Sequence, residues 1–332
     1  METDPGLAQA REAAEAMLGA PAEVAPVRGG RNSRIFHVRS AAGEYALKHY
    51  PAGDDPRDRL GTEAGALRLM QGIAAVPRLH AVDRERGYLL LSWIDGVPVD
   101  DVTDADIDAA AAFLAAVHAL RHAAGAADQP HASEACLSGA EIARQIEARL
   151  ARLRATGDAR LIAILDGDFT PAFRASLAQA RAALAARLDF AADIPHQWQT
   201  LVPSDFGYHN ALRRPDGSLA FVDFEYFGWD DPVKLTADIL LHPGRPLAPP
   251  QRQRFRAAAQ RLYDDPMFGQ RLAAYLPLFG LRWVLILLNE FLPEVWARRV
   301  RAGATESWEA AKARQLAAAR KFLSHLPEAA RA

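Results

Sequence analysis

The sequence predicts an α+β protein with a small antiparallel sheet in its N-terminal part and a large, mainly helical C-terminal part. Two patterns support this fold class. Apolar and polar residues alternate in short runs such as Tyr45-Ala-Leu-Lys48, which is typical of strands, whereas Ala- and Leu-rich runs with helical spacing dominate after Asp104. We therefore predict an N-terminal lobe over residues 1–94 and a C-terminal lobe over residues 95–332.

The N-terminal lobe is predicted to be a sheet interrupted by one helix. Leu60, Ala64 and Leu67 recur at helical spacing and indicate that helix. Glycines at positions 29, 30 and 43 predict the turns between strands. We expect an amphipathic surface helix over residues 1–20 and a strand region over 24–93. Within that region we expect the inserted helix over 56–71 and a last strand over 88–94, followed by a hinge over 94–99.

The C-terminal lobe is predicted to be mostly helical, with a short β element. Its first helices are expected over residues 105–122, 139–155 and 170–188, the strands over 200–203 and 218–223, and further helices from Pro232, apart from a Pro-rich connection over 242–250. The most apolar stretch, residues 281–292, contains Arg282, Asn289 and Glu290. It is shorter than the roughly 20 residues of a membrane span, so we predict a buried helix.

Charge and cysteine content narrow the class of function. The chain carries 39 Lys and Arg residues against 41 Asp and Glu residues, a net charge of −2, which argues against a nucleic-acid partner. The single cysteine, Cys136, allows no intrachain disulfide and favours a reducing compartment. We expect a cytoplasmic protein with no membrane partner, and no obligate protein partner is evident.

Three polar residues near the middle of the chain carry the strongest chemical signal. Asp205 is followed five residues later by Asn210, and Asp223 ends an apolar strand. Phosphoryl transfer from a nucleotide uses such a set, with one carboxylate to orient the acceptor hydroxyl and oxygen ligands to hold Mg²⁺. The short hairpin between Asn210 and Asp223 is suited to bring both onto one ion.

This segment resembles the aminoglycoside phosphotransferase family, which also includes choline kinase-like enzymes and has a protein-kinase-like fold of two lobes. The family's catalytic loop reads His-x-Asp-x-x-x-x-Asn, and its metal strand reads Asp-(Phe/Trp)-(Glu/Gly) followed by Gly-x-x-Asp-Pro. The matching segments here are 204–210, 223–225 and 228–232. The resemblance implies that Asp205 is the catalytic base and that Asn210 and Asp223 hold Mg²⁺.

The same resemblance implies nucleotide-binding residues in the N-terminal lobe. Lys48 matches the lysine that contacts the nucleotide phosphates, and Glu63 is its expected ion-pair partner, with Glu44, Asp58 and Glu85 as rivals. The phosphate-covering loop is expected at Gly29, Gly30, Asn32 and Ser33. The hinge that binds adenine is expected at Ser92, Trp93 and Ile94.

Six further residues are candidates for substrate contact or for support of the loops. Ser204 directly precedes Asp205 in the part of the loop where the family usually has a bracing histidine, and the absence of that histidine makes a pseudoenzyme an alternative. His209 is expected to orient its neighbours by a hydrogen bond, and Asp231 to cap the following helix. Glu225 is expected to assist metal or substrate or to stabilise the loop, while Trp229 and Trp283 are candidates for stacking on a substrate or for the core.

Together these observations predict a phosphotransferase that uses ATP or GTP with Mg²⁺. The predicted acceptor is a hydroxyl of a small polar metabolite, which is a sugar, an amino alcohol or an aminoglycoside-like compound. The alternatives are a non-catalytic nucleotide-binding regulator and an antibiotic-resistance kinase.

Overall fold

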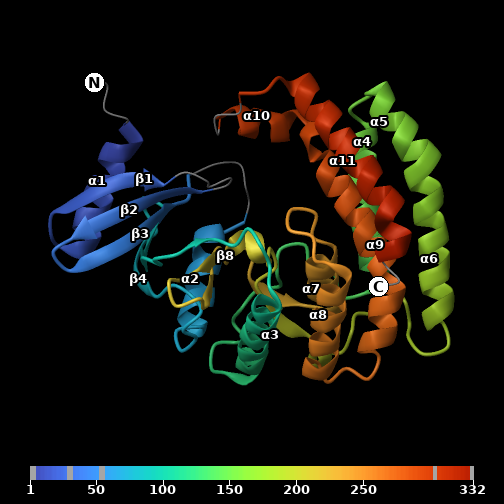
Figure 1. Cartoon of the computed structure of the whole chain (residues 1–332), viewed down its shortest axis with the longest axis horizontal. Coiled ribbons are helices and arrows are strands. Elements are labelled where there is room, and N and C mark those ends of the chain that lie inside the picture. Colours follow the sequence, from blue (N-terminus) through green and yellow to red (C-terminus); the bar gives the residue numbers. More distant parts are fainter. Residues whose placement is uncertain (1–4, 28–32, 52–56, 302–304, 330–332) are drawn as a thin grey trace. The chain divides into compact units, whose positions relative to one another are not determined.

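The computed structural model describes residues 5–27, 33–51, 57–301 and 305–329, and shows two compact units (Figure 1). The first unit comprises residues 1–133 and 201–229, and the second comprises residues 134–200 and 230–332. Each unit is therefore built from two separate stretches of chain. The α+β class and the small antiparallel sheet are confirmed, whereas the predicted lobe boundary after residue 94 stays a prediction.

The first unit holds a helix, a sheet with an inserted helix, and a later helix with a hairpin. Its helices are α1 (Pro5–Leu18), α2 (Arg59–Leu69) and α3 (Asp104–Ala119). Its strands are β1 (Ala22–Val27), β2 (Arg34–Ser40), β3 (Gly43–His49), β4 (Leu79–Asp83), β5 (Tyr88–Ser92), β6 (Val97–Pro98), β8 (Ala211–Arg213) and β9 (Leu219–Phe221).

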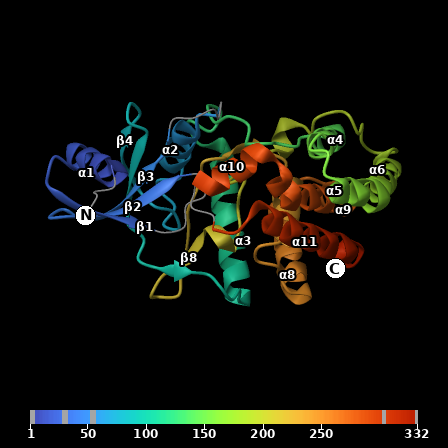
Figure 2. The ribbon, with the colours of Figure 1, turned by 90° about the horizontal axis from the view of Figure 1, so that it is seen from above.

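Among the described residues, five strands form an antiparallel sheet in the order β1-β2-β3-β5-β4. Helix α1 lies against this sheet (Figures 1 and 2), and its alanines pack with Val38, Leu47 and Leu90 in one buried cluster. Because successive side chains of a strand point to opposite faces, Lys48, next to Leu47, points away from α1. The sheet thus has one face closed by a helix and one face that carries Lys48.

The second part of this unit brings the predicted chemical residues onto a short hairpin. Strand β8 pairs with β9, and β6 pairs with the other edge of β8. A single 3₁₀ turn, Tyr208–Asn210, leads directly into β8. Residues 205–210 and residue 223 therefore lie at the same end of one hairpin.

The second unit is helical. It contains α4 (Gly139–Arg154), α5 (Ala159–Ile164), α6 (Thr170–Leu184), α7 (Pro232–Leu241), α8 (Pro249–Leu262), α9 (Phe268–Leu287), α10 (Pro293–Arg301) and α11 (Trp308–Ala329). Two short strands, β7 (Thr200–Val202) and β10 (Gly228–Asp230), lie where the chain passes from one unit to the other. The predicted helices over 105–122, 139–155 and 170–188 end one to four residues earlier in the structure, and α5 was not predicted.

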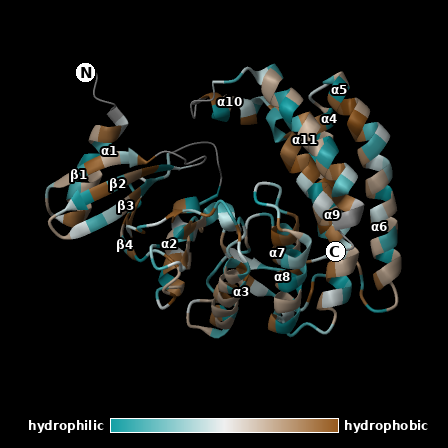
Figure 3. Cartoon of the chain, viewed as in Figure 1, coloured by the Kyte–Doolittle hydropathy of each residue, from teal (hydrophilic) through white to brown (hydrophobic). Residues whose placement is uncertain are grey.

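Helix α9 is the core helix of the second unit. It contacts α4, α6, α7 and α11, and Figure 3 shows mainly apolar residues along it. The segment Phe268–Phe291 has the length and composition of a membrane span, but 61% of its most apolar window is buried inside the structure. Burial among neighbouring helices explains this apolar character, as predicted for the stretch that ends near residue 292.

Candidate active site

Lys48 lies between two carboxylates in the first unit. Its Nζ is 2.6 Å from Oε2 of Glu63 on α2 and 2.6 Å from Oδ1 of Asp223, which follows β9. The side chains of Lys48 and Glu63 are 6% and 1% exposed, whereas that of Asp223 is 37% exposed. The lysine is therefore anchored on a buried carboxylate and reaches toward an accessible one.

This setting keeps Lys48 charged. Burial by itself lowers the pKa of a lysine, but the carboxylates of Glu63, Asp223 and Glu225 outweigh that effect and raise the pKa of Lys48 above its ordinary value. A buried ammonium with a fixed direction is suited to contact an anionic group such as a phosphate.

Glu63 is held at both of its carboxylate oxygens. Oε1 accepts a hydrogen bond from the backbone N–H of Phe224 at 3.2 Å, and Oε2 accepts from Lys48 and from the hydroxyl of Tyr50. The predicted ion pair of Lys48 with Glu63 is thus present. Of its rivals, Glu44 pairs with His37 and Arg39, and Asp58 caps α2 and pairs with Arg84.

Residues of the loop that carries Asp205 form hydrogen bonds with one another. The amide Nδ2 of Asn210 donates to the backbone carbonyl of Asp205 at 2.9 Å, and Nε2 of His209 lies 3.2 Å from Oδ1 of Asp205. The Asp205 side chain is 46% exposed. These contacts orient a carboxylate that solvent and a small substrate can reach, and the His209 contact is the predicted orienting bond.

Ser204 has an unusual backbone conformation. Its φ is +68°, in the left-handed region, and its carbonyl accepts from the N–H of Phe206 at 2.8 Å. Its hydroxyl lies 3.4 Å from the carbonyl oxygen of Ser133. The turn at Ser204 therefore directs Asp205 without the histidine that the motif usually has.

Helix α3 provides the platform for this loop. The ring of Phe206 stacks on Phe113 with centroids 5.5 Å apart, and the hydroxyl of Tyr208 donates to the carbonyl of Asp106 at 3.3 Å. Alternate loop residues are thus buried against α3, which leaves Asp205, His209 and Asn210 on the other side.

The hairpin pairs the backbone of Asn210 with that of Val222, next to Asp223, and the shared ion stays a prediction. The backbone N–H of Val222 donates to the carbonyl of Asn210 at 2.9 Å. Nδ2 of Asn210 is used in the loop, and its Oδ1 is the amide atom with the chemistry of a cation ligand. An amide oxygen and a partly exposed carboxylate are hard ligands that fit Mg²⁺.

Glu225 is buried two residues beyond Asp223. Its Oε2 lies 3.6 Å from Nη1 of Arg59, and burial, together with the charge of Asp223, raises its pKa. Its side chain is 1% exposed. Glu225 is thus a buried carboxylate beside Asp223, and the two roles predicted for it stay predictions.

The predicted hinge residues follow β5. Oγ of Ser92 accepts from the N–H of Arg78 at 2.9 Å, and the ring of Trp93 stacks on His37 with centroids 3.9 Å apart. Ile94 directly follows. In the phosphate-loop prediction, Ser33 is buried, whereas Gly29, Gly30 and Asn32 lie outside the described residues.

The comparison with protein families agrees with this geometry. Residues 23–271 match the model of the "Phosphotransferase enzyme family", a range that contains Lys48, Glu63, Asp205, Asn210 and Asp223. The chain belongs to this family. It is a phosphotransferase of the type that includes choline kinases and aminoglycoside phosphotransferases, which confirms the predicted family and enzyme class.

Solved structures of this family have the same fold at low sequence identity. A choline/ethanolamine kinase family protein from Mesorhizobium loti has 19% identity and a TM-score of 0.62, covering 100% of this chain and 99% of its own. The macrolide 2'-phosphotransferase MphH from Brachybacterium faecium has 18% identity and a TM-score of 0.58, with 91% and 96% covered. Spectinomycin phosphotransferase APH(9)-Ia, solved with ADP and spectinomycin, has 12% identity and a TM-score of 0.60, with 95% and 98% covered.

These neighbours confirm the protein-kinase-like fold predicted for the phosphotransferase. No curated protein matches the chain by sequence.

Three residues predicted to contact substrate or support the loops of this phosphotransferase make contacts within their own unit. Trp229 is buried and its Nε1 donates to the carbonyl of Ala126 at 2.9 Å, so stacking on a substrate is not supported. Asp231 caps α7, as predicted, by accepting from the N–H of Val233 at 2.8 Å. Trp283, in the second unit, packs edge-on against His242 with centroids 5.0 Å apart.

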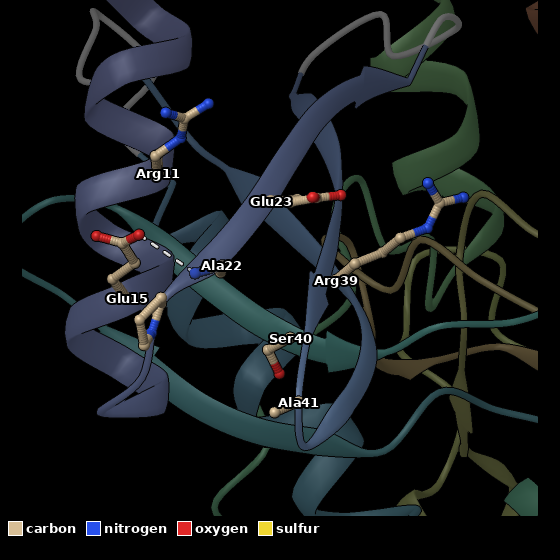
Figure 4. A pocket seen from close by; sticks show the side chains of 8 residues that line it. Arg11, Glu15, Ala22, Glu23, Arg39, Ser40 and Ala41 are labelled. Atoms are coloured by element: carbon tan, nitrogen blue, oxygen red, sulfur yellow. Dashed lines mark hydrogen bonds between the residues drawn. The ribbon is translucent and has the colours of Figure 1, made fainter.

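An open pocket of about 500 Å³ lies elsewhere in the first unit (Figure 4). It is formed by α1 and the ends of β1 and β2, where Glu15 accepts from the N–H of Ala22 at 3.2 Å. Its lining residues are Arg11, Glu15, Pro21, Ala22, Glu23, Arg39, Ser40 and Ala41. None of the predicted site residues lines it.

Sequence reasoning missed Tyr50, Arg59 and His37, all of which touch the predicted site. Tyr50 follows Lys48 by two residues, just beyond the end of β3, and in an extended chain this spacing places both side chains on one face, which was a usable signal. Arg59 and His37 have no such signal, because their partners Glu225 and Trp93 are far away in sequence.

Proposed function

We propose that this phosphotransferase transfers the γ-phosphoryl group of ATP to a hydroxyl of a small polar metabolite. The observation that carries the proposal is the position of Lys48, bound equally to the buried Glu63 and the accessible Asp223. Lys48 would contact the nucleotide phosphates, and Asn210 and Asp223 would hold Mg²⁺, which offsets the phosphate charge.

Asp205 is the proposed catalytic base. It would accept a hydrogen bond from the substrate hydroxyl and so align the hydroxyl oxygen with the γ-phosphorus. As the new P–O bond forms and the bond to the ADP oxygen breaks, the hydroxyl proton passes to the Asp205 carboxylate. His209 and Asn210 would keep this carboxylate and its backbone in position through their contacts with Asp205.

The acceptor is proposed to be a sugar or an amino alcohol rather than an antibiotic. The segments Pro-Ser-Asp-Phe-Gly over 203–207 and Trp-Asp-Asp-Pro-Val-Lys over 229–234 favour a branch distinct from the resistance enzymes. The solved neighbours are named for choline or ethanolamine, a macrolide and spectinomycin, all of which carry hydroxyls, so they support a hydroxyl as the acceptor group. We also propose a cytoplasmic location, where ATP and a reduced Cys136 are available.

The test is Mg²⁺-dependent ATP consumption by the purified protein with a panel of sugars, amino alcohols and aminoglycosides. Turnover with one class of acceptor is expected, and Asp205→Asn should reduce kcat on the order of 10³-fold, the contribution of a positioned general base. Retention of the wild-type rate by Asp205→Asn would overturn the assignment. Tight binding of ATP without turnover of any acceptor would instead indicate the nucleotide-binding regulator.

A further inference from the structure

Tyr50 lies directly beside the Lys48 and Glu63 pair. Its hydroxyl donates to Oε2 of Glu63, the oxygen that also accepts from Lys48. Only 7% of the residue is exposed. Tyr50 is therefore part of the buried end of the cluster, remote from solvent.

The ring of Tyr50 is fixed by two cations. Nζ of Lys48 lies 5.0 Å from the ring centroid and the guanidinium carbon of Arg59 lies 5.6 Å from it. Arg59 also approaches Glu225 at 3.6 Å. Cations at these distances attract the face of an aromatic ring, so the phenol has a defined orientation toward Glu63.

Lys48 is shared between the carboxylates of Glu63 and Asp223. Lys48 is at the same distance, 2.6 Å, from Glu63 and from Asp223. In the proposed function Asp223 would hold a cation and Lys48 would contact a phosphate, so the contact between Lys48 and Asp223 would open. Only Glu63 then keeps Lys48 in place, and a carboxylate held by several donors does this better than one that rotates.

We propose that Tyr50 is a positioning residue that fixes the carboxylate of Glu63, so that Lys48 stays directed at the nucleotide phosphates. This proposal rests on the proposed function of Lys48. Burial and the charge of Glu63 raise the pKa of Tyr50 well above its ordinary value, which keeps the phenol a hydrogen-bond donor.

The test removes only the hydroxyl. We expect Tyr50→Phe to weaken the binding of Mg·ATP about tenfold or more, the effect of losing one hydrogen bond to a charged group. Calorimetry measures this Kd directly. Once an acceptor is known, KM for ATP should rise while KM for the acceptor stays unchanged.

Tyr88→Phe is the matched control. Tyr88 is a buried tyrosine at the start of β5, stacked on His49, and it belongs to the cluster under α1. Its variant should bind Mg·ATP as the wild type does. The rise in unfolding temperature on adding Mg·ATP gives a second measure of binding, which remains usable if Tyr50→Phe lowers stability.

A double-mutant cycle separates positioning from general structural support. If Tyr50 acts through Glu63, Tyr50→Phe should change the Kd for Mg·ATP about twofold or less in the background of Glu63→Gln. Equal losses in both backgrounds, or wild-type binding by Tyr50→Phe, would overturn the proposal. The proposed function fails separately, when Lys48→Met and Asp205→Asn both retain the wild-type turnover.

Discussion

Each unit of the molecule buries a cation between two carboxylates, and the two clusters differ in exposure. In the first unit, Lys48 lies between Glu63 and Asp223, and Asp223 is 37% exposed. In the second unit, the side chain of Arg271 is 0% exposed and bonds Asp231 and Asp265, each of which is 1% exposed. One cluster has an accessible carboxylate, and the other is sealed.

The difference separates a site from a structural support. In the sealed cluster every charge is already paired, because Asp231 also caps α7 and Asp265 accepts from the N–H of Met267. A ligand could replace one of these ion-pair partners only if the core opened. In the Lys48 cluster, Asp223 is accessible while Glu63 is buried, as the proposed exchange of the lysine for a cation at Asp223 requires. In this molecule the exposure of Asp223 is what distinguishes the Lys48 cluster as a candidate site.

The largest expected effect is the loss of activity at the accessible carboxylate. Asp223→Asn should reduce kcat on the order of 10³-fold, since a metal site contributes several kcal/mol of charge stabilisation. Asparagine tolerates the left-handed φ of +72° at this position, so the fold should persist. Steady-state kinetics and thermal unfolding check this together. A strongly destabilised Asp223→Asn variant would contradict the contrast between the two clusters.

The sealed cluster should show the opposite behaviour. Arg271→Met leaves two buried carboxylates without a cation and should lower the free energy of unfolding by about 3–5 kcal/mol. The protein that remains folded should keep its turnover number. Urea unfolding with activity measurements tests this. Arg152→Gln is the control, because Arg152 and Glu294 form an exposed pair in the same unit, worth at most about 1 kcal/mol.

A smaller effect is expected at Glu134, whose carboxylate bonds Arg149 and Arg282 in the second unit. Burial raises its pKa, but the two arginines and Lys234 outweigh this and lower the pKa to about 2. Because the folded state has the lower pKa, the stabilisation is present above pH about 4.5 and is lost as the pH falls toward 2. Unfolding of wild type and Glu134→Gln at pH 6, 4.5 and 3 should show a shrinking difference. A difference that stays constant with pH would disprove this role.

Local patterns were sufficient to predict most elements and the central motif. The helical spacing around Leu67 predicted α2, and the alternation around Lys48 predicted β3. Asp205, Asn210 and Asp223 were found because a loop and a hairpin of fixed length connect them. The helix α5 escaped prediction because its six residues are too few for a periodic signal.

The partners of the site residues were harder to predict. Glu63 competed with three other acidic residues on sequence grounds, and only the packing of α2 beside the sheet selects it. The sequence left Trp229 as a candidate for substrate stacking or for the core. In the structure its indole is buried and Nε1 donates to the carbonyl of Ala126. The contact of Arg59 with Glu225 joins residues 166 positions apart by their numbering, and no local pattern reports it.

The sequence by itself determined the fold class, the hairpin between Asn210 and Asp223, and the family to which the chain belongs. These features depend on residue spacing over short segments. The regular backbone geometry of strands, turns and helices relates that spacing directly to structure. The tertiary structure decided which charges meet and which remain accessible. Desolvation and pairing depend on the three-dimensional arrangement of distant segments, and they distinguish the open cluster of Lys48 from the sealed cluster of Arg271.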